Sequence, residues 1–349
     1  MEENKEQKTK FSTKLFSWIT GYGKDGKGVM KREIIKGYNL KNLFRLYFRR
    51  FSPIFTLNII YILGNFPIVF LVLAMSGLTS HVSDTPVDTL FPIIHGIQTI
   101  TPNSPSVLPL LGVFGNTSTI YASTTFTYIL YGLSALDLFL IGPVNMGIYY
   151  LMRELVRGEP LFIKDDFIGA VKNNWKQGII FGLFDTVMLF LIGYSVYSYY
   201  VNYSNYYILF YASLVMALFY LMMRNYIYLL SVTFDESIFK ILKESFIFTL
   251  LRFGKNFLAL LGCIFLSVTA FALSRLFMPL GVIMFMVFLI STNIYLCVYA
   301  AYPKIKEIKL DPFYKEHPEE KPYGWDGIME EGRRAEVDES EEIVPPGDY

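Results

Sequence analysis

The stretch Gly178–Tyr200 reads GIIFGLFDTVMLFLIGYSVYSYY, and its 23 residues include one charged side chain, Asp185. A helix needs about 20 apolar residues to cross the hydrocarbon core of a bilayer, because lipid cannot hydrogen-bond to exposed backbone groups. This stretch has that length and that composition. It therefore predicts a membrane-spanning helix.

Five other apolar stretches have a similar length, so the sequence predicts six spans. They are approximately Ser52–Met75, Phe126–Met152, Tyr206–Leu230, Phe257–Leu273 and Met278–Tyr302. Only 17% of the residues are charged, against about 25% in soluble domains, and 53% are hydrophobic. Too few polar side chains remain to cover a globule in water. We expect an all-α integral membrane bundle of about six transmembrane helices, with amphipathic helices at the interface.

The distribution of Lys and Arg predicts the orientation of these spans. No Lys or Arg lies between Arg50 and Arg153, whereas residues 153–177 contain five. The connector at 201–205 has none, and basic residues return in the connector after it and beyond the last span. Cytoplasmic connectors carry the excess of positive charge. The pattern therefore places both termini on the cytoplasmic side of the plasma membrane, with the lipid bilayer as the surrounding solvent.

Three regions follow from composition: a basic leader at 1–37, the six-helix domain at 38–302 with an outer loop at 76–125, and an acidic tail at 303–349. The tail has twice as many acidic as basic residues, together with several prolines, which predicts disorder until a partner binds. Residues 38–51 place apolar side chains at helical spacing among basic ones, which predicts an amphipathic helix on the inner leaflet. Anionic lipid explains the basic leader, so we expect no nucleic-acid partner.

Several short motifs carry a resemblance to a known family. These motifs are Gly142-Pro143, Tyr149-Tyr150, Leu155-Val156-Arg157-Gly158-Glu159 and Asn174-Trp175-Lys176-Gln177-Gly178, with Asn65-Phe66-Pro67-Ile68-Val69 earlier in the chain. They are similar to motifs of the YesL family of bacterial polytopic membrane proteins, which have no assigned biochemical activity. Genes of that family often stand beside carbohydrate-uptake systems, so the resemblance implies a link to sugar transport. The outer loop and the long tails depart from the family's pattern.

Ionisable side chains inside spans are costly and are therefore the first candidates for a functional role. Asp185 and Arg224 lie roughly 12 and 9 Å from the inner face of two consecutive antiparallel spans, at 1.5 Å per residue, which predicts a pair. Asp137 and Arg275 lie at comparable heights, which predicts a second pair if their spans are neighbours. Each pair either neutralises its charges and fixes helix register or belongs to a proton- or substrate-linked relay.

Proline also interrupts the apolar pattern of two spans, at Gly64-Asn65-Phe66-Pro67 and at Gly142-Pro143-Val144-Asn145. Transporters build binding sites near the midplane from broken helices whose ends are exposed. The candidate broken-helix site therefore consists of Asn65, Pro67, Gly142, Pro143 and Asn145. Proline kinks are also ordinary in membrane helices, and the asparagines could simply hydrogen-bond between helices.

The sequence lacks the signatures of catalysis and of metal binding. The three histidines lie in the outer loop and the tail, and no P-loop, nucleophile elbow or zinc motif occurs. We expect no enzymatic activity, no cofactor and no metal site. The leading hypothesis is a protein associated with solute uptake, with carbohydrate implied by the resemblance, as an accessory to a sugar permease complex or as a carrier. The alternative is a non-transporting scaffold or envelope-homeostasis protein that recruits partners through its tails.

Overall fold

A computed structural model describes residues 37–102 and 104–320 of the chain. The predicted leader, apart from Gly37, and the tail beyond residue 320 lie outside the described residues. The chain forms two compact units. Of the described residues, one unit contains 37–64 and 139–320, and the other contains those of Asn65–Leu138.

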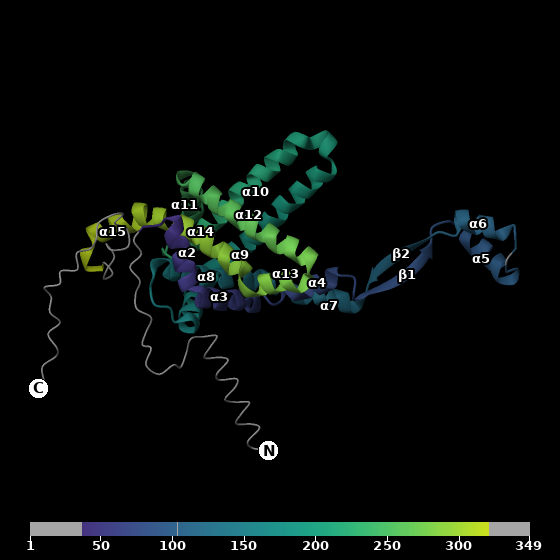
Figure 1. The fold of residues 1–349 in the computed structure, drawn as a ribbon, viewed down its shortest axis with the longest axis horizontal. Helices are drawn as coiled ribbons and strands as arrows, with labels where there is room; N and C mark the ends of the chain where they lie inside the picture. Colours follow the sequence, from purple (N-terminus) through teal and green to yellow (C-terminus); the bar gives the residue numbers. More distant parts are fainter. Residues whose placement is uncertain (1–36, 103, 321–349) are drawn as a thin grey trace, which may run out of the picture. The chain divides into compact units, whose positions relative to one another are not determined.

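The first unit is built from helices (Figure 1). In chain order they are α2 (Leu40–Arg49), α3 (Phe51–Gly64), α8 (Asp137–Arg157, whose first two residues belong to the second unit), α9 (Ile163–Val201), α10 (Tyr203–Ser231), α11 (Ile238–Leu251), α12 (Phe253–Leu276), α13 (Met278–Met284), α14 (Ile290–Ile305) and α15 (Asp311–Glu316). Two π-helical segments, Phe285–Leu289 and Lys306–Leu310, join the last three helices, and a short 3-10 helix at Pro318–Glu320 follows.

The all-α fold class is confirmed. In the described part of the chain, five helical segments are long and apolar enough to cross a membrane, or six if α3 and α4 (Ile68–Met75) together count as one span. Helix α2 occupies the stretch predicted to be an amphipathic interfacial helix, and its Leu40, Phe44 and Phe48 form an exposed apolar row. Its other face binds α14, where Tyr295 donates a hydrogen bond to the Leu43 carbonyl over 2.8 Å.

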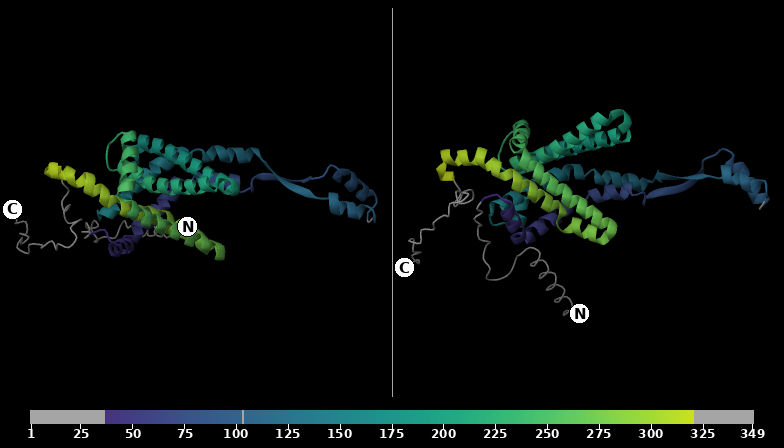
Figure 2. Two further views of the ribbon diagram at one scale, coloured as in Figure 1. Left: turned by 90° about the horizontal axis from the view of Figure 1, so that it is seen from above. Right: turned by 45° about the horizontal axis from the view of Figure 1, so that its top comes forward.

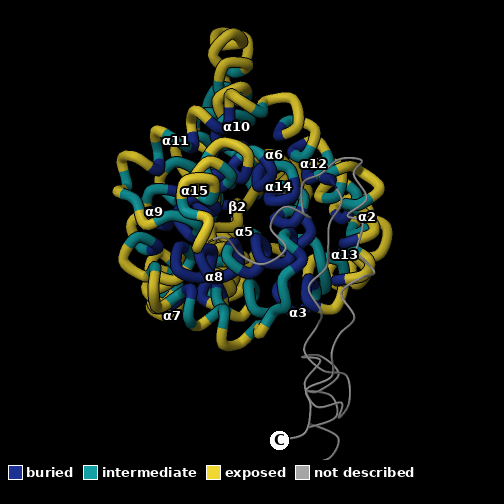
Figure 3. Tube along the Cα trace, turned by 90° about the vertical axis from the view of Figure 1, so that its left-hand side faces the viewer, coloured by how far each residue is buried: buried dark blue, intermediate teal, exposed yellow. Residues whose placement is uncertain are grey.

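The core of the first unit lies along α8 and α14, which carry more buried residues than any other helix of that unit (Figure 3). All but one of residues 142–156 in α8 are buried. A helix that is buried on every side has to be apolar or hydrogen-bonded on every side. Arg153, near the end of α8, meets this requirement by donating to the Val232 carbonyl over 2.5 Å and to Glu154 over 2.8 Å.

Helix α9 is longer than the span predicted within it. The basic segment 163–177 and the predicted span at 178–200 belong to one continuous helix of 39 residues. No proline lies within it, and its first turn is favourable because Asp166 accepts a hydrogen bond from the Phe162 N–H over 2.8 Å. At 1.5 Å per residue the helix is about 58 Å long.

The C-terminal boundary of the six-helix domain also differs from the expected one. The acidic tail was expected from residue 303, but α14 continues through Pro303 and helical structure extends to Glu316. The reason is a tertiary contact that composition does not reveal. Lys309 binds Glu236 over 2.7 Å and Glu244 over 2.6 Å, and its ammonium lies 4.0 Å from the centre of the Phe234 ring. These contacts hold the chain after α14 against the α10–α11 connector.

The Glu236–Lys309 contact predicts a pH dependence. Burial raises the pKa of Glu236, but Lys309 and Lys240 outweigh it, so the pKa lies below its ordinary value of 4.5. A carboxylate with a lowered pKa stabilises the fold above pH 4.5, and this stabilisation is lost as the pH falls through the folded-state pKa. We expect the thermal stability of the detergent-solubilised protein to fall between pH 6 and pH 3 by less than about 1 kcal/mol from this group. Glu236→Gln should show a shallower fall, and an unchanged pH profile would contradict the assignment.

Asn58 of α3 binds the π-helical segment between α13 and α14. Its amide donates to the carbonyls of Phe285 and Met286 over 2.9 and 2.8 Å, and its carbonyl oxygen accepts from the Ser291 N–H over 2.9 Å. A π-helical turn widens the helix and leaves backbone groups without regular partners. Asn58, which is fully buried, supplies those partners and so joins the first span to the last.

We expect Asn58→Leu to destabilise this junction markedly. The substitution leaves three backbone groups without partners, each worth about 1–3 kcal/mol when buried. Thermal denaturation in detergent measures the loss. Asn293→Leu is the matched control, because the Asn293 amide donates one long hydrogen bond of 3.3 Å to Ser267. Equal stability of the two variants would mean that Asn58 does not hold the π-helical turn.

The second unit shows that the predicted outer loop is ordered. It consists of α4, β1 (Ser80–Pro86), α5 (Phe91–Ile100), α6 (Val107–Phe114), β2 (Thr117–Ser123) and α7 (Thr125–Ser134). Strands β1 and β2 form an antiparallel ladder from Ser80↔Ser123 to Pro86↔Thr117, and α5 and α6 pack together beyond its Pro86↔Thr117 end (Figure 2). Helices α4 and α7 pack against each other beyond its Ser80↔Ser123 end. There Thr124 and Thr127 both donate to the Thr79 carbonyl, over 2.7 and 2.9 Å.

Candidate functional site

The structure brings Asp185 of α9 and Arg224 of α10 together inside the first unit. The Arg224 Nε donates to Asp185 Oδ1 over 3.0 Å, and an Arg224 terminal nitrogen pairs with Oδ2. Two tyrosines complete the environment of the carboxylate, since Tyr220 donates to Oδ1 over 2.8 Å and Tyr228 to Oδ2 over 3.1 Å. Asp185 is only 2% exposed. We call Asp185, Arg224, Tyr220 and Tyr228, with Asn145 and Tyr149 of α8, the Asp185 cluster.

Sequence reasoning missed the tyrosines, although a signal for them exists. Tyr220, Arg224 and Tyr228 are four residues apart, so they share one face of α10. A partner for Arg224 on the neighbouring helix also contacts the residues one turn above and one turn below it. The spacing could therefore have identified both hydroxyl donors.

Helix α8 contributes the third side of the cluster. The Asn145 side chain lies beside Tyr228 and is 1% exposed, and its amide nitrogen has no hydrogen-bond partner among the described residues. The Tyr149 ring stacks on the Tyr228 ring with centroids 5.2 Å apart, and its hydroxyl donates to Asn225 over 2.6 Å. Polar side chains from α8, α9 and α10 thus meet around one carboxylate.

Gly142 and Pro143 do not form a broken-helix site, which corrects that expectation. Helix α8 runs through both residues, and Gly142 faces α9 at its closest approach. A Cβ on Gly142 would overlap the Gly178 carbonyl and lie 2.9 Å from the Cα of Gly182, and a Cβ on Gly178 would lie 3.0 Å from the Cα of Pro143. The glycines allow the two backbones to touch, as small residues do in membrane helices. This close contact fixes the heights of Asn145 and Asp185.

The other predicted residues fall in both units. The interruption expected at Asn65 and Pro67 is present, because α3 ends at Gly64 and α4 begins at Ile68. Asp137 lies at the start of α8, in the second unit. Arg275 lies in the first unit, near the end of α12, where its guanidinium is 5.4 Å from the centre of the Phe271 ring. The Asp137–Arg275 pair stays a prediction.

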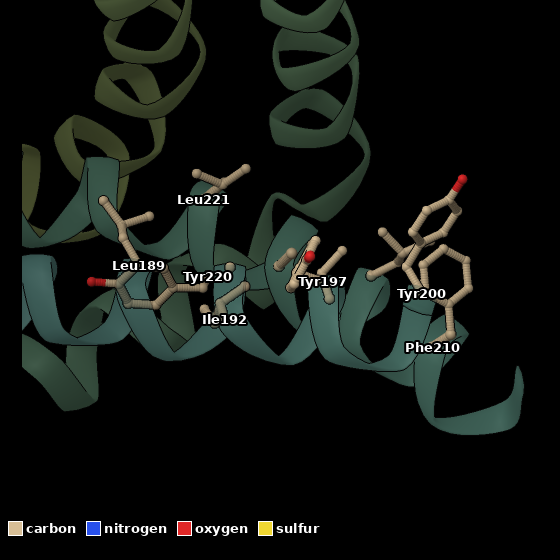
Figure 4. Close-up of a pocket in the computed structure, with 11 residues that line it drawn as sticks. Leu189, Ile192, Tyr197, Tyr200, Phe210, Tyr220 and Leu221 are labelled. Carbon is tan, nitrogen blue, oxygen red and sulfur yellow. The ribbon is translucent and has the colours of Figure 1, made fainter. Parts of the chain in front are cut away.

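An apolar groove lies between α9 and α10, beside the Asp185 cluster (Figure 4). Its volume is about 580 Å³, and it is open on one side. Leu189 and Tyr220 line one end, whereas Tyr200 and Phe210 line the other, near the turn that connects the two helices. Tyr220 belongs to both features, because its ring lines the groove and its hydroxyl binds Asp185.

This geometry favours a structural function for the ion pair. Both oxygens of Asp185 accept hydrogen bonds from more than one donor, and the carboxylate is shielded from solvent. A proton relay needs an accessible acceptor, whereas a register-fixing pair needs saturation. In the described parts of the chain, no group of three or more His, Cys, Asp or Glu residues is placed to hold a metal ion.

The fold and this cluster define a helical protein with the long apolar helices of a polytopic membrane protein. Residues 107–196 match the model of a family described as a protein of unknown function, DUF624. The match runs from α6 into α9 and includes Gly142, Asn145 and Asp185, but it ends before Arg224. It covers about a quarter of the chain, and the resemblance to YesL-like proteins is consistent with it. A search of curated proteins and a search of solved structures gave no match.

Proposed function

We propose that this protein is a multi-pass plasma-membrane protein that serves a solute-uptake system as an accessory subunit. The solute class is carbohydrate, as the resemblance to YesL-like proteins implies. The proposed role is non-enzymatic and needs no cofactor. The partner is a sugar permease complex in the same membrane.

One observation carries the choice of accessory over carrier, namely that the buried side chains of Asn58 and Asp185 already have their hydrogen-bond partners within the bundle. Carriers hold their solute near the midplane, on exposed helix ends and accessible polar groups. Here Asn58, Asn145 and Asp185 are at most 2% exposed. Asn58 and Asp185 make hydrogen bonds within the bundle, and Asn145 packs beside Tyr228. A solute would have to replace these contacts, which favours a bundle that positions a partner over one that binds solute itself.

The arrangement of basic side chains supports cytoplasmic termini. Arg50 donates to the Gly158 carbonyl over 3.3 Å, and Arg153 donates to the Val232 carbonyl. Lys309 binds Glu236, four residues after Val232. These contacts gather basic groups from the start of α3 and the ends of α8 and α14 at one end of the first unit, as a cytoplasmic face requires.

Uptake and reconstitution experiments test this proposal. A strain that lacks the chain should lose uptake of at least one labelled sugar, and the wild-type chain should restore it. Purified chain in liposomes should give no sugar flux above that of empty liposomes, because an accessory needs its permease. Sugar flux by the chain alone would replace the accessory role with a carrier role. Normal uptake of a broad sugar panel in the deletion strain would remove the link to uptake.

The second unit supports the alternative role of a scaffold that recruits partners. Helices α5 and α6 expose Ile93, Ile97, Ile100, Leu110 and Val113, each at least 44% accessible. Apolar patches of this kind often mark interaction sites. Deletion of residues 87–116 separates the two roles. Loss of co-purifying membrane proteins with intact sugar uptake would favour the scaffold.

A further inference from the structure

The α9–α10 groove has the length of one leaflet of a bilayer. Its lining on α9 runs from Leu189 to Tyr200, and these two residues are eleven positions or about 16 Å apart at 1.5 Å per residue. Half of the hydrocarbon core is about 15 Å. Both helices are candidate spans, so the open side of the groove faces the surroundings that a span has, which are acyl chains. Lined mainly by apolar side chains, the groove matches a single lipid chain that lies along the helices.

The end of the groove near Tyr200 is unusual for a lipid contact, because it is rich in tyrosine and has no charged side chain. Residues 186–223 contain no charged side chain. Tyr197 and Tyr200 line the groove and are 67% and 66% exposed, and the hydroxyls of Tyr203 and Tyr211 lie 3.2 Å apart nearby in the chain. Anionic headgroups are attracted by Lys and Arg, which this end lacks. Tyrosine hydroxyls both donate and accept hydrogen bonds, which suits an uncharged headgroup with many hydroxyls.

We propose that the α9–α10 groove binds one chain of a neutral glycolipid, with the sugar headgroup at Tyr197 and Tyr200. The leaflet is the one at the uncharged end of the hairpin, which is the outer leaflet in the proposed orientation. This inference goes beyond the uptake role and does not depend on it. Glycolipid binding by a chain that does not affect uptake would leave the inference intact, and an uptake role without lipid preference would leave only the proposed function.

Native mass spectrometry of the purified full chain tests the proposal with three diacyl lipids of equal chain length: a diglucosyl diacylglycerol, phosphatidylglycerol and phosphatidylethanolamine. We expect the glycolipid to bind about tenfold more tightly than either phospholipid. The Tyr197→Phe and Tyr200→Phe double variant keeps the rings and removes the hydroxyls. It should bind all three lipids about equally. Equal binding of the three lipids by the wild-type chain would overturn the proposal.

Filling the groove gives a second, independent measurement. Gly193 lines the groove, and a Cβ placed on it meets nothing within 4 Å, so Gly193→Phe puts a ring into the groove without a backbone clash. We expect glycolipid binding to fall about tenfold. Leu191→Phe is the matched control on the same helix, because Leu191 is 52% exposed and does not line the groove. Ala217→Leu, on the facing helix, repeats the test if Gly193→Phe does not elute as a single species.

Two outcomes of the groove-filling experiment would overturn the proposal. In one, Gly193→Phe and Ala217→Leu bind glycolipid as the wild type does. In the other, the wild-type chain carries a co-purifying protein that both groove variants lose, with no retained lipid. The groove would then be a helix-docking site.

Discussion

Asp185→Asn is expected to destabilise the protein by about 3–5 kcal/mol, the cost of removing one partner from a buried ion pair. The substitution leaves the Arg224 guanidinium without its counter-ion inside the bundle, and Tyr220 and Tyr228 lose an ionic acceptor. Thermal denaturation in detergent, together with the amount of chain recovered from membranes, measures the effect. Both should fall sharply.

Two further variants identify the cause. Asp185→Leu combined with Arg224→Leu removes both charges, so it should recover most of the stability that Asp185→Asn loses. Asp235→Asn, at an exposed position in the α10–α11 connector, should leave stability unchanged. Wild-type abundance of Asp185→Asn together with lost sugar uptake would reverse our interpretation and support a relay.

Gly142→Val is expected to have a comparably large effect through a different mechanism. The new side chain meets the backbone of α9 at Gly178 and Gly182, and neither of these residues has a side chain that could move aside. Overpacking of this kind costs about 1–3 kcal/mol for a small group and more where backbone must shift. Gly142→Ala should lie at the lower end of that range. The loss of folded chain is measured by size-exclusion chromatography after heating.

Glycine positions elsewhere in α9 provide the control. A Cβ on Gly169 or Gly193 meets nothing within 4 Å, so alanine should be neutral or should stabilise by up to about 1 kcal/mol, since alanine favours the helix. If Gly142→Ala were as stable as Gly169→Ala, then α8 and α9 would not be in close contact in solution.

Features with a strong local signal could be predicted from the sequence. Five of the six predicted apolar stretches coincide with long helices, and the first coincides with the bent pair α3 and α4, because hydropathy depends on neighbours in the chain. The Asp185–Arg224 contact could be predicted from the depth of each residue in its span. Two charged residues at similar depths in an antiparallel helical hairpin have few other charged partners. Tyr220 and Tyr228 repeat at helical spacing and could have been added by the same reasoning.

Features that depend on distant contacts could not be predicted. Pro303 looks like the end of a span, but Lys309 reaches Glu236 and Glu244 and holds the helix beyond it. Gly142 looks like a helix breaker, and only the partner glycines on α9 show that it is a packing position. In the outer loop, polar and apolar residues alternate only weakly along the strands. Its two helices have ten and eight residues, which is too short for a clear helical periodicity in the sequence.

Helix α9 extends without interruption on both sides of its close contact with α8. From the contact at Gly178 and Gly182, the helix continues for about 23 Å to Ile163 and for about 29 Å to Val201. No proline interrupts α9, so we expect a displacement of its basic part around Lys172 to be transmitted along the helix to the part that carries Tyr197 and Tyr200. Because the facing wall of the groove belongs to α10, we expect such a displacement to change the width of the groove.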